Sequence, residues 1–241
     1  MFKGFNNRQQ NGFPLTNFFQ DISAYGYGGV TFWLDAAFGL NTQTNLGAVS
    51  RWMPRVGASP FIQDTVASQP RFILNDANYN NFPSVQTVSD RNMSTPAGQG
   101  LKLTQNSTIL IVSKVDVNTN TNGIIGLASP QNCIFDGGNT AGYNGFGFLG
   151  SAIQFQGTTE STSARIKIIT STNIIINGSV EATGSIGNAN ADLITLFRGN
   201  NLGGNGALIG SIAEIIAFNY SMTSTDAIAL SDRINQKYAL Y

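Results

Sequence analysis

The chain of 241 residues contains no histidine, a single cysteine and little charge. Histidine is the commonest general base and transition-metal ligand in proteins, so its absence removes both of those roles. Cys133 alone can form no disulfide within the chain. Lys, Arg, Asp and Glu make up 11% of the residues, against about 25% in typical domains, and their formal charges sum to zero. The chain therefore lacks the clustered Lys and Arg that nucleic-acid binding requires.

Long apolar runs are also missing. No stretch approaches the roughly 20 apolar residues that a membrane-spanning helix needs. The N-terminal sequence MFKGFNNRQQNGF lacks the apolar segment of a secretory signal. Together with the single cysteine, these features predict folding in a reducing cytoplasm, with neither a membrane nor a nucleic acid as partner.

Paired carboxylates that could hydrolyse a glycosidic bond are absent from every predicted strand. Retaining glycosidases hold two carboxyl groups about 5 Å apart. The glutamates are Glu160, Glu181 and Glu214, and none has a second carboxylate two or four residues away. A pair assembled from distant strands stays open, which keeps a glycan hydrolase as the least favoured function. The sequence therefore predicts a protein without enzymatic activity.

Short β-type runs, by contrast, are abundant. About a dozen of them are separated by polar turns at intervals of roughly 8–12 residues, which is typical of a β-sandwich. The clearest are VTFWLD at 30–35 and STILIVSKVDV at 107–117. Residues 164–180 predict a hairpin in which Arg165 and Lys167 face outward, with the intervening isoleucines facing inward.

The C-terminal part predicts one buried strand followed by one helix. Residues 208–218 are apolar on both faces, so they need cover on both sides, as a central strand in packed layers has. Thr223 and Asp226 have the spacing of a capping pair at a helix N-terminus. One apolar helical face then recurs at three- and four-residue spacing: Ala227, Leu230, Ile234 and Tyr238. The expected fold class is an all-β, two-sheet antiparallel jelly-roll sandwich with one short C-terminal helix.

Residues 1–29 form a distinct segment that is rich in Asn, Gln and Gly, and its aromatic residues follow no structural period. Gly28 and Gly29 would act as a hinge. The aromatic side chains could cover the edge of their own domain, or dock onto a partner subunit as interface anchors do. The residues expected to dock are Phe2, Phe5, Phe13, Phe18 and Phe19. The predicted division is therefore an N-terminal anchoring arm over 1–29 and a jelly-roll domain over 30–241.

Two blocks of sequence resemble the concanavalin A-like, laminin-G-like jelly-roll superfamily. The first contains FWLDAAFGL, VSRW, QPRFI and FPSVQ, and the second is GSIAEIIAFNYSMTSTDAIALSDRINQKYAL. Members open with similar W-L-D-A, V-x-x-W, Q-P and P-x-V elements, and they close with a strand, a bend containing Asn and a short helix ending near K-Y. The resemblance implies the jelly-roll fold for residues 30–241. It does not set the function, because the superfamily includes lectins, glucanases, adhesion modules and virion proteins.

Calcium is the one metal ion that this composition favours, because Ca²⁺ binds Asp, Asn and backbone oxygens, and some domains of this superfamily carry such a site. In the segment FDGGNTAGYNG, expected to be a loop, the candidate calcium ligands are Asp136, Asn139 and Asn144. Tyr143 and Phe146 could provide an aromatic platform for a glycan. The alternative is that these residues only cap turns. No other cofactor is expected.

These features predict a non-enzymatic structural protein of a tailed-phage virion, either a capsid decoration protein or a head or tail fibre component. The N-terminal arm would anchor a homo-oligomer to capsid or tail subunits, and the lectin-like sandwich would face outward. The alternative is a carbohydrate-binding, receptor-recognition module of a tail fibre or a bacterial surface, with a cell-surface glycan as its partner.

Overall fold

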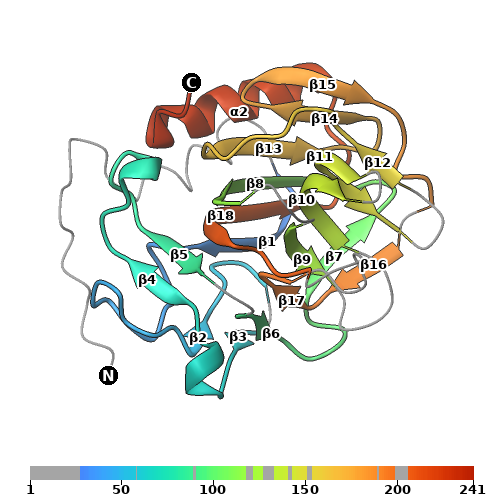
Figure 1. Ribbon diagram of the computed structural model, residues 1–241. Coiled ribbons are helices and arrows are strands. Elements are labelled where there is room, and N and C mark those ends of the chain that lie inside the picture. Colours follow the sequence, from blue (N-terminus) through green and yellow to red (C-terminus); the bar gives the residue numbers. More distant parts are fainter. Residues whose placement is uncertain are drawn as a thin grey trace.

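The computed structural model describes residues 28–57, 59–88, 91–117, 122–126, 133–140, 143–150, 154–188, 190–198 and 206–241. In these residues the chain forms two 8-stranded sheets, one 2-stranded sheet and one α-helix (Figure 1). All pairings between the named strands are antiparallel. The predicted all-β sandwich with a C-terminal helix is confirmed.

The first sheet has the order β15–β14–β13–β8–β18–β5–β4, and β1 also pairs with β18. Its strands are β1 (Val30–Asp35), β4 (Arg71–Ile73), β5 (Ser84–Thr87), β8 (Thr108–Val115), β13 (Arg165–Ile169), β14 (Asn173–Ile176), β15 (Ser179–Thr183) and β18 (Gly210–Phe218). The predicted strand at 30–35 coincides with β1. Strand β18 is buried at every position, as its apolar faces predicted.

The second sheet has the order β12–β11–β10–β9–β17–β6–β3–β2. Its strands are β2 (Arg51–Trp52), β3 (Phe61–Ile62), β6 (Met93–Ser94), β9 (Asn122–Gly126), β10 (Cys133–Thr140), β11 (Tyr143–Leu149), β12 (Gln154–Gln156) and β17 (Thr195–Leu196). Strands β7 (Leu101–Thr104) and β16 (Asn190–Leu193) pair separately, and the two 3₁₀ turns are η1 (Val66–Ser68) and η2 (Ala77–Tyr79).

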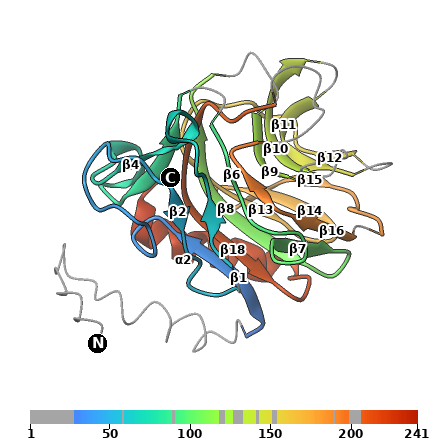
Figure 2. The same ribbon diagram turned by 90° about the horizontal axis from the view of Figure 1, so that it is seen from below.

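The molecule has three layers with an apolar core at each of the two junctions. The principal core lies between the sheets and includes Ile111 and Ile215 from the first sheet and Phe148 from the second. A second core lies between the outer face of the first sheet and α2 (Ser224–Tyr238). Helix α2 contacts β13, β14 and β15, and Figure 2 shows strands β9–β12 on the side of the first sheet away from α2. Because α2 covers the face of the first sheet that is turned away from the second sheet, the central strands of the first sheet are apolar on both faces.

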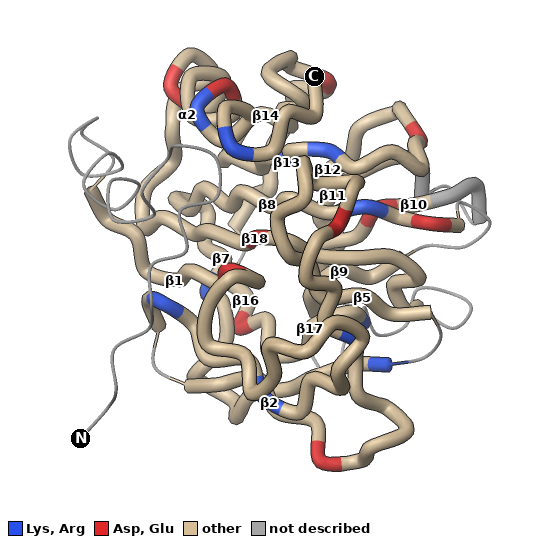
Figure 3. The backbone as a smooth tube through the Cα atoms, turned by 90° about the vertical axis from the view of Figure 1, so that its left-hand side faces the viewer, with Lys and Arg blue, Asp and Glu red and all other residues tan. Residues whose placement is uncertain are grey.

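Helix α2 begins where the capping pair predicted. The Thr223 hydroxyl accepts a hydrogen bond from the Asp226 amide at 3.2 Å and donates to the Asp226 carboxylate at 2.7 Å. The four residues of the predicted apolar face are all buried. Within the described residues, no helix is both long enough and apolar enough to cross a membrane. Charged residues are sparse and of mixed sign along the chain (Figure 3).

The facing of the β13–β14 hairpin was predicted wrongly. The hairpin itself and its turns are as expected, with Asn177 and Gly178 at φ 48° and 73° leading into β15. However, Ile166 and Ile168 pack in the core beneath α2, whereas Arg165 and Lys167 are buried and form ion pairs with a residue of the second sheet. Both faces of the first sheet are covered, one by α2 and the other by the second sheet. The alternation of apolar and charged residues separates the two faces but does not show that neither of them meets water.

The segment FDGGNTAGYNG was also predicted wrongly as a loop. Most of it forms the hairpin of β10 and β11, in which Gly137 pairs with Gly145. Within the segment, Gly145 has φ 70°, and an added Cβ atom there would lie 3.0 Å from the Gly157 carbonyl carbon, just beyond the end of β12. At that position glycine permits close approach of neighbouring strands rather than a loop.

Candidate functional site

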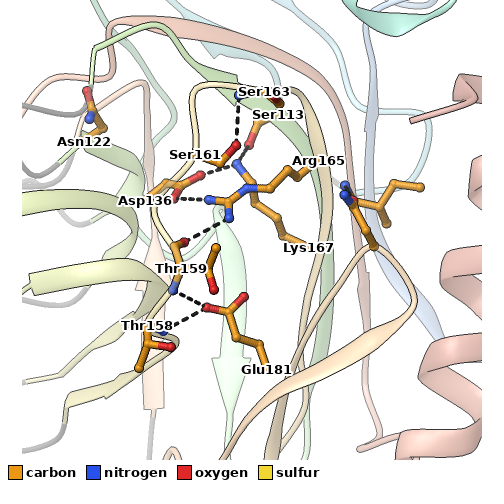
Figure 4. A network of polar contacts seen from close by, with 12 residues as sticks. Ser113, Asn122, Asp136, Thr158, Thr159, Ser161, Ser163, Arg165, Lys167 and Glu181 are labelled. Atoms are coloured by element: carbon orange, nitrogen blue, oxygen red, sulfur yellow. Dashed lines mark hydrogen bonds and ion pairs between the residues drawn. The ribbon is translucent and has the colours of Figure 1, made fainter. Parts of the chain in front are cut away.

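An ionic cluster lies between the two sheets, and we call it the inter-sheet cluster: Ser113, Asp136, Arg165 and Lys167 (Figure 4). The Arg165 guanidinium donates to Asp136 Oδ1 at 2.8 Å, and Lys167 Nζ forms an ion pair with Asp136 Oδ2. Lys167 Nζ also donates to Ser113 Oγ at 2.9 Å. Asp136 belongs to β10 of the second sheet and the other three residues belong to the first, so the cluster connects the sheets.

The inter-sheet cluster is almost completely removed from solvent. The side chains of Asp136, Arg165 and Lys167 are 2%, 4% and 0% exposed. Burial lowers the pKa of Lys167 to about 8, with Arg165 acting in the same direction and Asp136 opposing it. Among the described residues, Arg165 Nε has no hydrogen-bond partner. Buried charges are expensive even when they are paired, so the cluster is a candidate for a role beyond stability.

A polar loop, residues 157–163, closes over the cluster. Arg165 Nη1 donates to the Thr159 carbonyl oxygen at 3.0 Å. The amides of Thr158 and Thr159 donate to Glu181 Oε1 of β15 at 2.8 and 2.7 Å. Figure 4 shows Arg165 and Glu181 of the first sheet on either side of Thr159, with Asp136 of the second sheet nearby. The loop is therefore held through its backbone by one guanidinium and one carboxylate.

A second polar constellation lies on the outer face of the first sheet, beneath the end of α2. Asp35 of β1 and Glu214 of β18 are cross-strand partners. Glu214 Oε1 accepts from Trp33 Nε1 at 2.8 Å, and Oε2 accepts from Tyr238 OH at 2.7 Å and from Lys237 Nζ at 3.1 Å. The network ties the last turn of α2 to the centre of the sheet.

The pKa values of this carboxylate pair move in opposite directions. Burial raises the pKa of Glu214, and the charge of Asp35 adds to the increase. Burial also acts to raise the pKa of Asp35, but Lys237 and Arg55 outweigh it and the pKa is lowered. The sequence left open a hydrolase whose two carboxylates come from distant strands, and Asp35 and Glu214 are such a pair. Glu214, however, is 0% exposed, so in this conformation the pair anchors α2 and does not meet a ligand.

Beside this pair, an exposed aromatic ring rests on a guanidinium, and we call the group the Phe38 platform: Trp33, Asp35, Phe38 and Arg55. Phe38 is 42% exposed, and Arg55 Cζ lies 4.5 Å from its ring centroid and 5.4 Å from that of Trp33. Arg55 Nε and Nη2 donate to Asp35 Oδ2 at 2.9 and 2.8 Å. Within the described residues, Phe38 and Tyr241 are the aromatic side chains exposed by more than a third.

The sequence-predicted calcium and glycan residues are not arranged as a common site in the described part of the chain. The carboxylate of Asp136 is occupied by Arg165 and Lys167, which does not suit a calcium ligand. Phe146 is 0% exposed in the principal core, so it presents no platform to a sugar. The side chains of Asn139, Tyr143 and Asn144 lie outside the described residues, and their roles stay predictions. Among the residues described, no cluster of three or more Asp, Glu or Cys side chains could hold a metal ion.

The aromatic residues predicted to dock onto a partner are Phe2, Phe5, Phe13, Phe18 and Phe19, and all of them lie outside the described residues. Their role stays a prediction. The Phe38 platform was not predicted from the sequence, although Trp33, Asp35 and Phe38 all lie in FWLDAAFGL, one of the motifs that resemble the superfamily. What identifies the platform is the exposure of one ring, which depends on the strand pairing.

Comparison with known proteins shows similarity in structure only. No protein-family model matches the sequence, and no curated protein matches it. Domain 4 of AbnA, a GH43 extracellular arabinanase from Geobacillus stearothermophilus solved with arabinotriose, superposes with a TM-score of 0.54 at 11% identity, over 84% of this chain and 98% of that one. A mutant GH54 α-L-arabinofuranosidase gives 0.53 at 11% identity, over 79% of this chain and 51% of that one. The binding domain of Paraclostridial Mosquitocidal Protein 1 gives 0.50 at 11% identity, over 85% and 52%.

These likenesses contradict the expectation of a protein without enzymatic activity. The same fold occurs within a GH43 arabinanase and a GH54 arabinofuranosidase, so that expectation does not stand. This chain spans about half the length of the arabinofuranosidase and of the binding domain. At 11% identity the comparisons show the fold alone: a β-sandwich of the jelly-roll kind.

Proposed function

We propose that the protein binds carbohydrate and that a sugar ring stacks on the Phe38 platform. The observation that carries the proposal is an exposed aromatic ring whose hidden face is held by a guanidinium. Small-molecule sites combine apolar or aromatic surface with a few fixed polar groups, and the C–H face of a sugar ring is an apolar surface of the matching size. The Arg55 side chain is 16% exposed, so part of a charged side chain reaches solvent next to the ring.

The platform is rigid before any ligand arrives. The Phe38 amide donates to the Asp35 carbonyl oxygen at 2.9 Å, and the Ala37 amide donates to Asp35 Oδ1 at 2.8 Å. The backbone of Arg55 is fixed to β1, because its amide donates to the Trp33 carbonyl oxygen at 2.7 Å. A ring that is already ordered loses little conformational entropy on binding, which favours affinity.

The structural relatives support a glycan as the ligand. The arabinanase domain was solved with arabinotriose, and its whole length superposes on most of this chain. A second relative is described as a binding domain. A carbohydrate-binding role therefore has more support than passive decoration.

Substituting Phe38 with alanine is expected to weaken glycan binding by about 2 kcal/mol, roughly 30-fold, because a central aromatic anchor is lost. Phe38→Trp should bind at least as well as the natural protein. A glycan array would first identify the ligand, and calorimetric titration would then compare the variants.

The matched control is Tyr241→Ala, which removes the other exposed aromatic ring and should leave binding unchanged. Thermal melting of each variant would confirm that the fold is intact. Equal affinity of Phe38→Ala and the natural protein would reject the platform, and failure of the natural protein to bind any glycan would reject carbohydrate binding itself.

We also propose, on sequence alone, that the binding module stands on a tailed-phage virion and that its N-terminal arm anchors it. Deleting residues 1–28 should leave a folded domain that binds glycan but no longer enters particles. The measurement is the amount of protein that copurifies with virions, and full incorporation of the truncated chain would reject the anchoring role.

A further inference from the structure

We propose that Lys167 and Asp136 condense into an intramolecular amide bond, which joins the two sheets of the sandwich covalently. The amine and the carboxyl group are in direct contact, come from opposite sheets and are closed off from solvent. The proposal is independent of carbohydrate binding, because neither residue belongs to the Phe38 platform.

Both reacting groups are held by regular structure. Lys167 is paired on both sides within the first sheet, with Ile111 of β8 and Ile176 of β14. Asp136 is paired on both sides within the second sheet, with Asn122 and Phe146. The backbone positions are therefore fixed, and the two side chains meet across the space between the sheets.

The side-chain contacts orient the reacting atoms. Ser113 Oγ accepts from Lys167 Nζ at 2.9 Å and holds the amine against the carboxylate. Arg165 Nη2 donates to Asp136 Oδ1 at 2.8 Å, which leaves Oδ2 facing the amine. Holding two reactants in such a geometry replaces an encounter in solution with a step inside one molecule.

The reaction needs no group beyond those present. One proton moves from the Lys167 ammonium to Asp136 Oδ2, giving a neutral amine and a neutral carboxylic acid. Burial favours this transfer, since it lowers the pKa of Lys167 to about 8. The nitrogen lone pair then forms a bond to Asp136 Cγ, and the negative charge that develops on Oδ1 is stabilised by Arg165.

The tetrahedral intermediate collapses to the amide. A second proton passes from the nitrogen to Oδ2, the Cγ–Oδ2 bond breaks with its electron pair on oxygen, and Oδ2 leaves as water. The nitrogen keeps one hydrogen, and Oδ1 becomes the amide carbonyl oxygen. One C–N bond forms, one C–O bond breaks and no atom is oxidised or reduced.

Of the other lysine–aspartate pairs in the described residues, Lys237 and Asp35 are 3.9 Å apart and so not in direct contact, and two are open to solvent. Lys102 and Asp192 approach to 3.1 Å with side chains 51% and 21% exposed, and Lys114 and Asp116 approach to 2.6 Å with side chains 23% and 27% exposed. Water reaches both of these pairs, so neither has the closed contact that condensation needs. A buried amide would give this chain a covalent tie between sheets that its one cysteine cannot supply.

The test is the mass of the intact, folded protein. The natural chain should be lighter than its sequence predicts by one water molecule. Trypsin should fail to cleave after Lys167, and tandem mass spectrometry should show one branched peptide containing Asp136 and Lys167. Lys167→Met should have the full mass of its sequence, whereas the control Lys102→Met should still lack one water.

Loss of water has one competing origin at this position. Asp136 is followed by Gly137, and an Asp–Gly bond can lose water by closing on its own backbone as a succinimide. That product does not involve Lys167, so it would persist in Lys167→Met and would leave the tryptic site after Lys167 open. Either of these results, or a natural protein with its full sequence mass, overturns the proposal whether or not the variant folds.

Discussion

Asp136→Ala is expected to lower the free energy of unfolding by about 3–5 kcal/mol, because it prevents the proposed amide and leaves Arg165 and Lys167 as buried cations without a carboxylate. Arg165 and Lys167 are too deeply buried to be rescued by solvent in the folded state. Domains of ordinary size are stable by only about 5–15 kcal/mol, so this variant should lie close to the threshold of unfolding. Urea denaturation at neutral pH, followed by tryptophan fluorescence, measures the difference.

Two comparisons separate the effect of burial from the general loss of an ion pair. Asp116→Ala breaks the partly exposed contact with Lys114 and should cost at most about 1 kcal/mol. The triple variant Asp136→Leu, Arg165→Met and Lys167→Met removes every buried charge and should recover most of the loss. It should remain less stable than the natural protein, because it also lacks the proposed amide. If Asp136→Ala lowers the free energy of unfolding by less than about 1 kcal/mol, Arg165 and Lys167 do not depend on Asp136 for their stability in the core.

The elements that were predicted from sequence are those whose signals are local. The capping contact between Thr223 and Asp226 and the apolar face of α2 depend on residues three or four apart. The buried strand β18 was predicted because both of its faces are apolar. The direction in which the Arg165 and Lys167 side chains point was not predicted, because alternation defines the two faces of a strand without saying which of them meets water. Their partner, Asp136, lies on the other sheet and far along the chain.

The candidate site depended on pairings that no local pattern reveals. Asp35 and Glu214 become neighbours only through the register of β1 against β18. Phe38 and Phe146 are the same residue type, and one is exposed while the other is in the core, because of where the chain turns after β1 and where β11 packs. Glycines in FDGGNTAGYNG indicated a loop, yet glycine also permits the close strand contact found there. Exposure and long-range pairing therefore decided the site, and both are properties of the folded chain.

The second large effect is expected at Glu214. Glu214→Ala should lower the free energy of unfolding by about 3–5 kcal/mol, since it breaks a buried charge pair and removes the acceptor for two further buried donors. Trp33 Nε1, Tyr238 OH and Lys237 Nζ all donate to this carboxylate. The same urea titration measures the loss, and Glu160→Ala, at an exposed loop position, is the control expected to change stability by less than about 0.5 kcal/mol.

Glu214→Gln separates charge from hydrogen bonding through its pH dependence. The pKa of Glu214 is raised above its ordinary value of 4.5, so the folded protein binds this proton more tightly than the unfolded chain does. The resulting stabilisation is fully present below 4.5 and is lost as the pH rises through the raised pKa. Stability of the natural protein relative to Glu214→Gln should therefore fall as the pH rises from 4.5 through the raised pKa. The pKa of Asp35 is lowered, so this residue changes the stability only below its ordinary pKa of 3.8, which lies outside this pH range. A stability difference that grows with pH would instead mean that Lys237 holds Glu214 as an anion against the effect of burial.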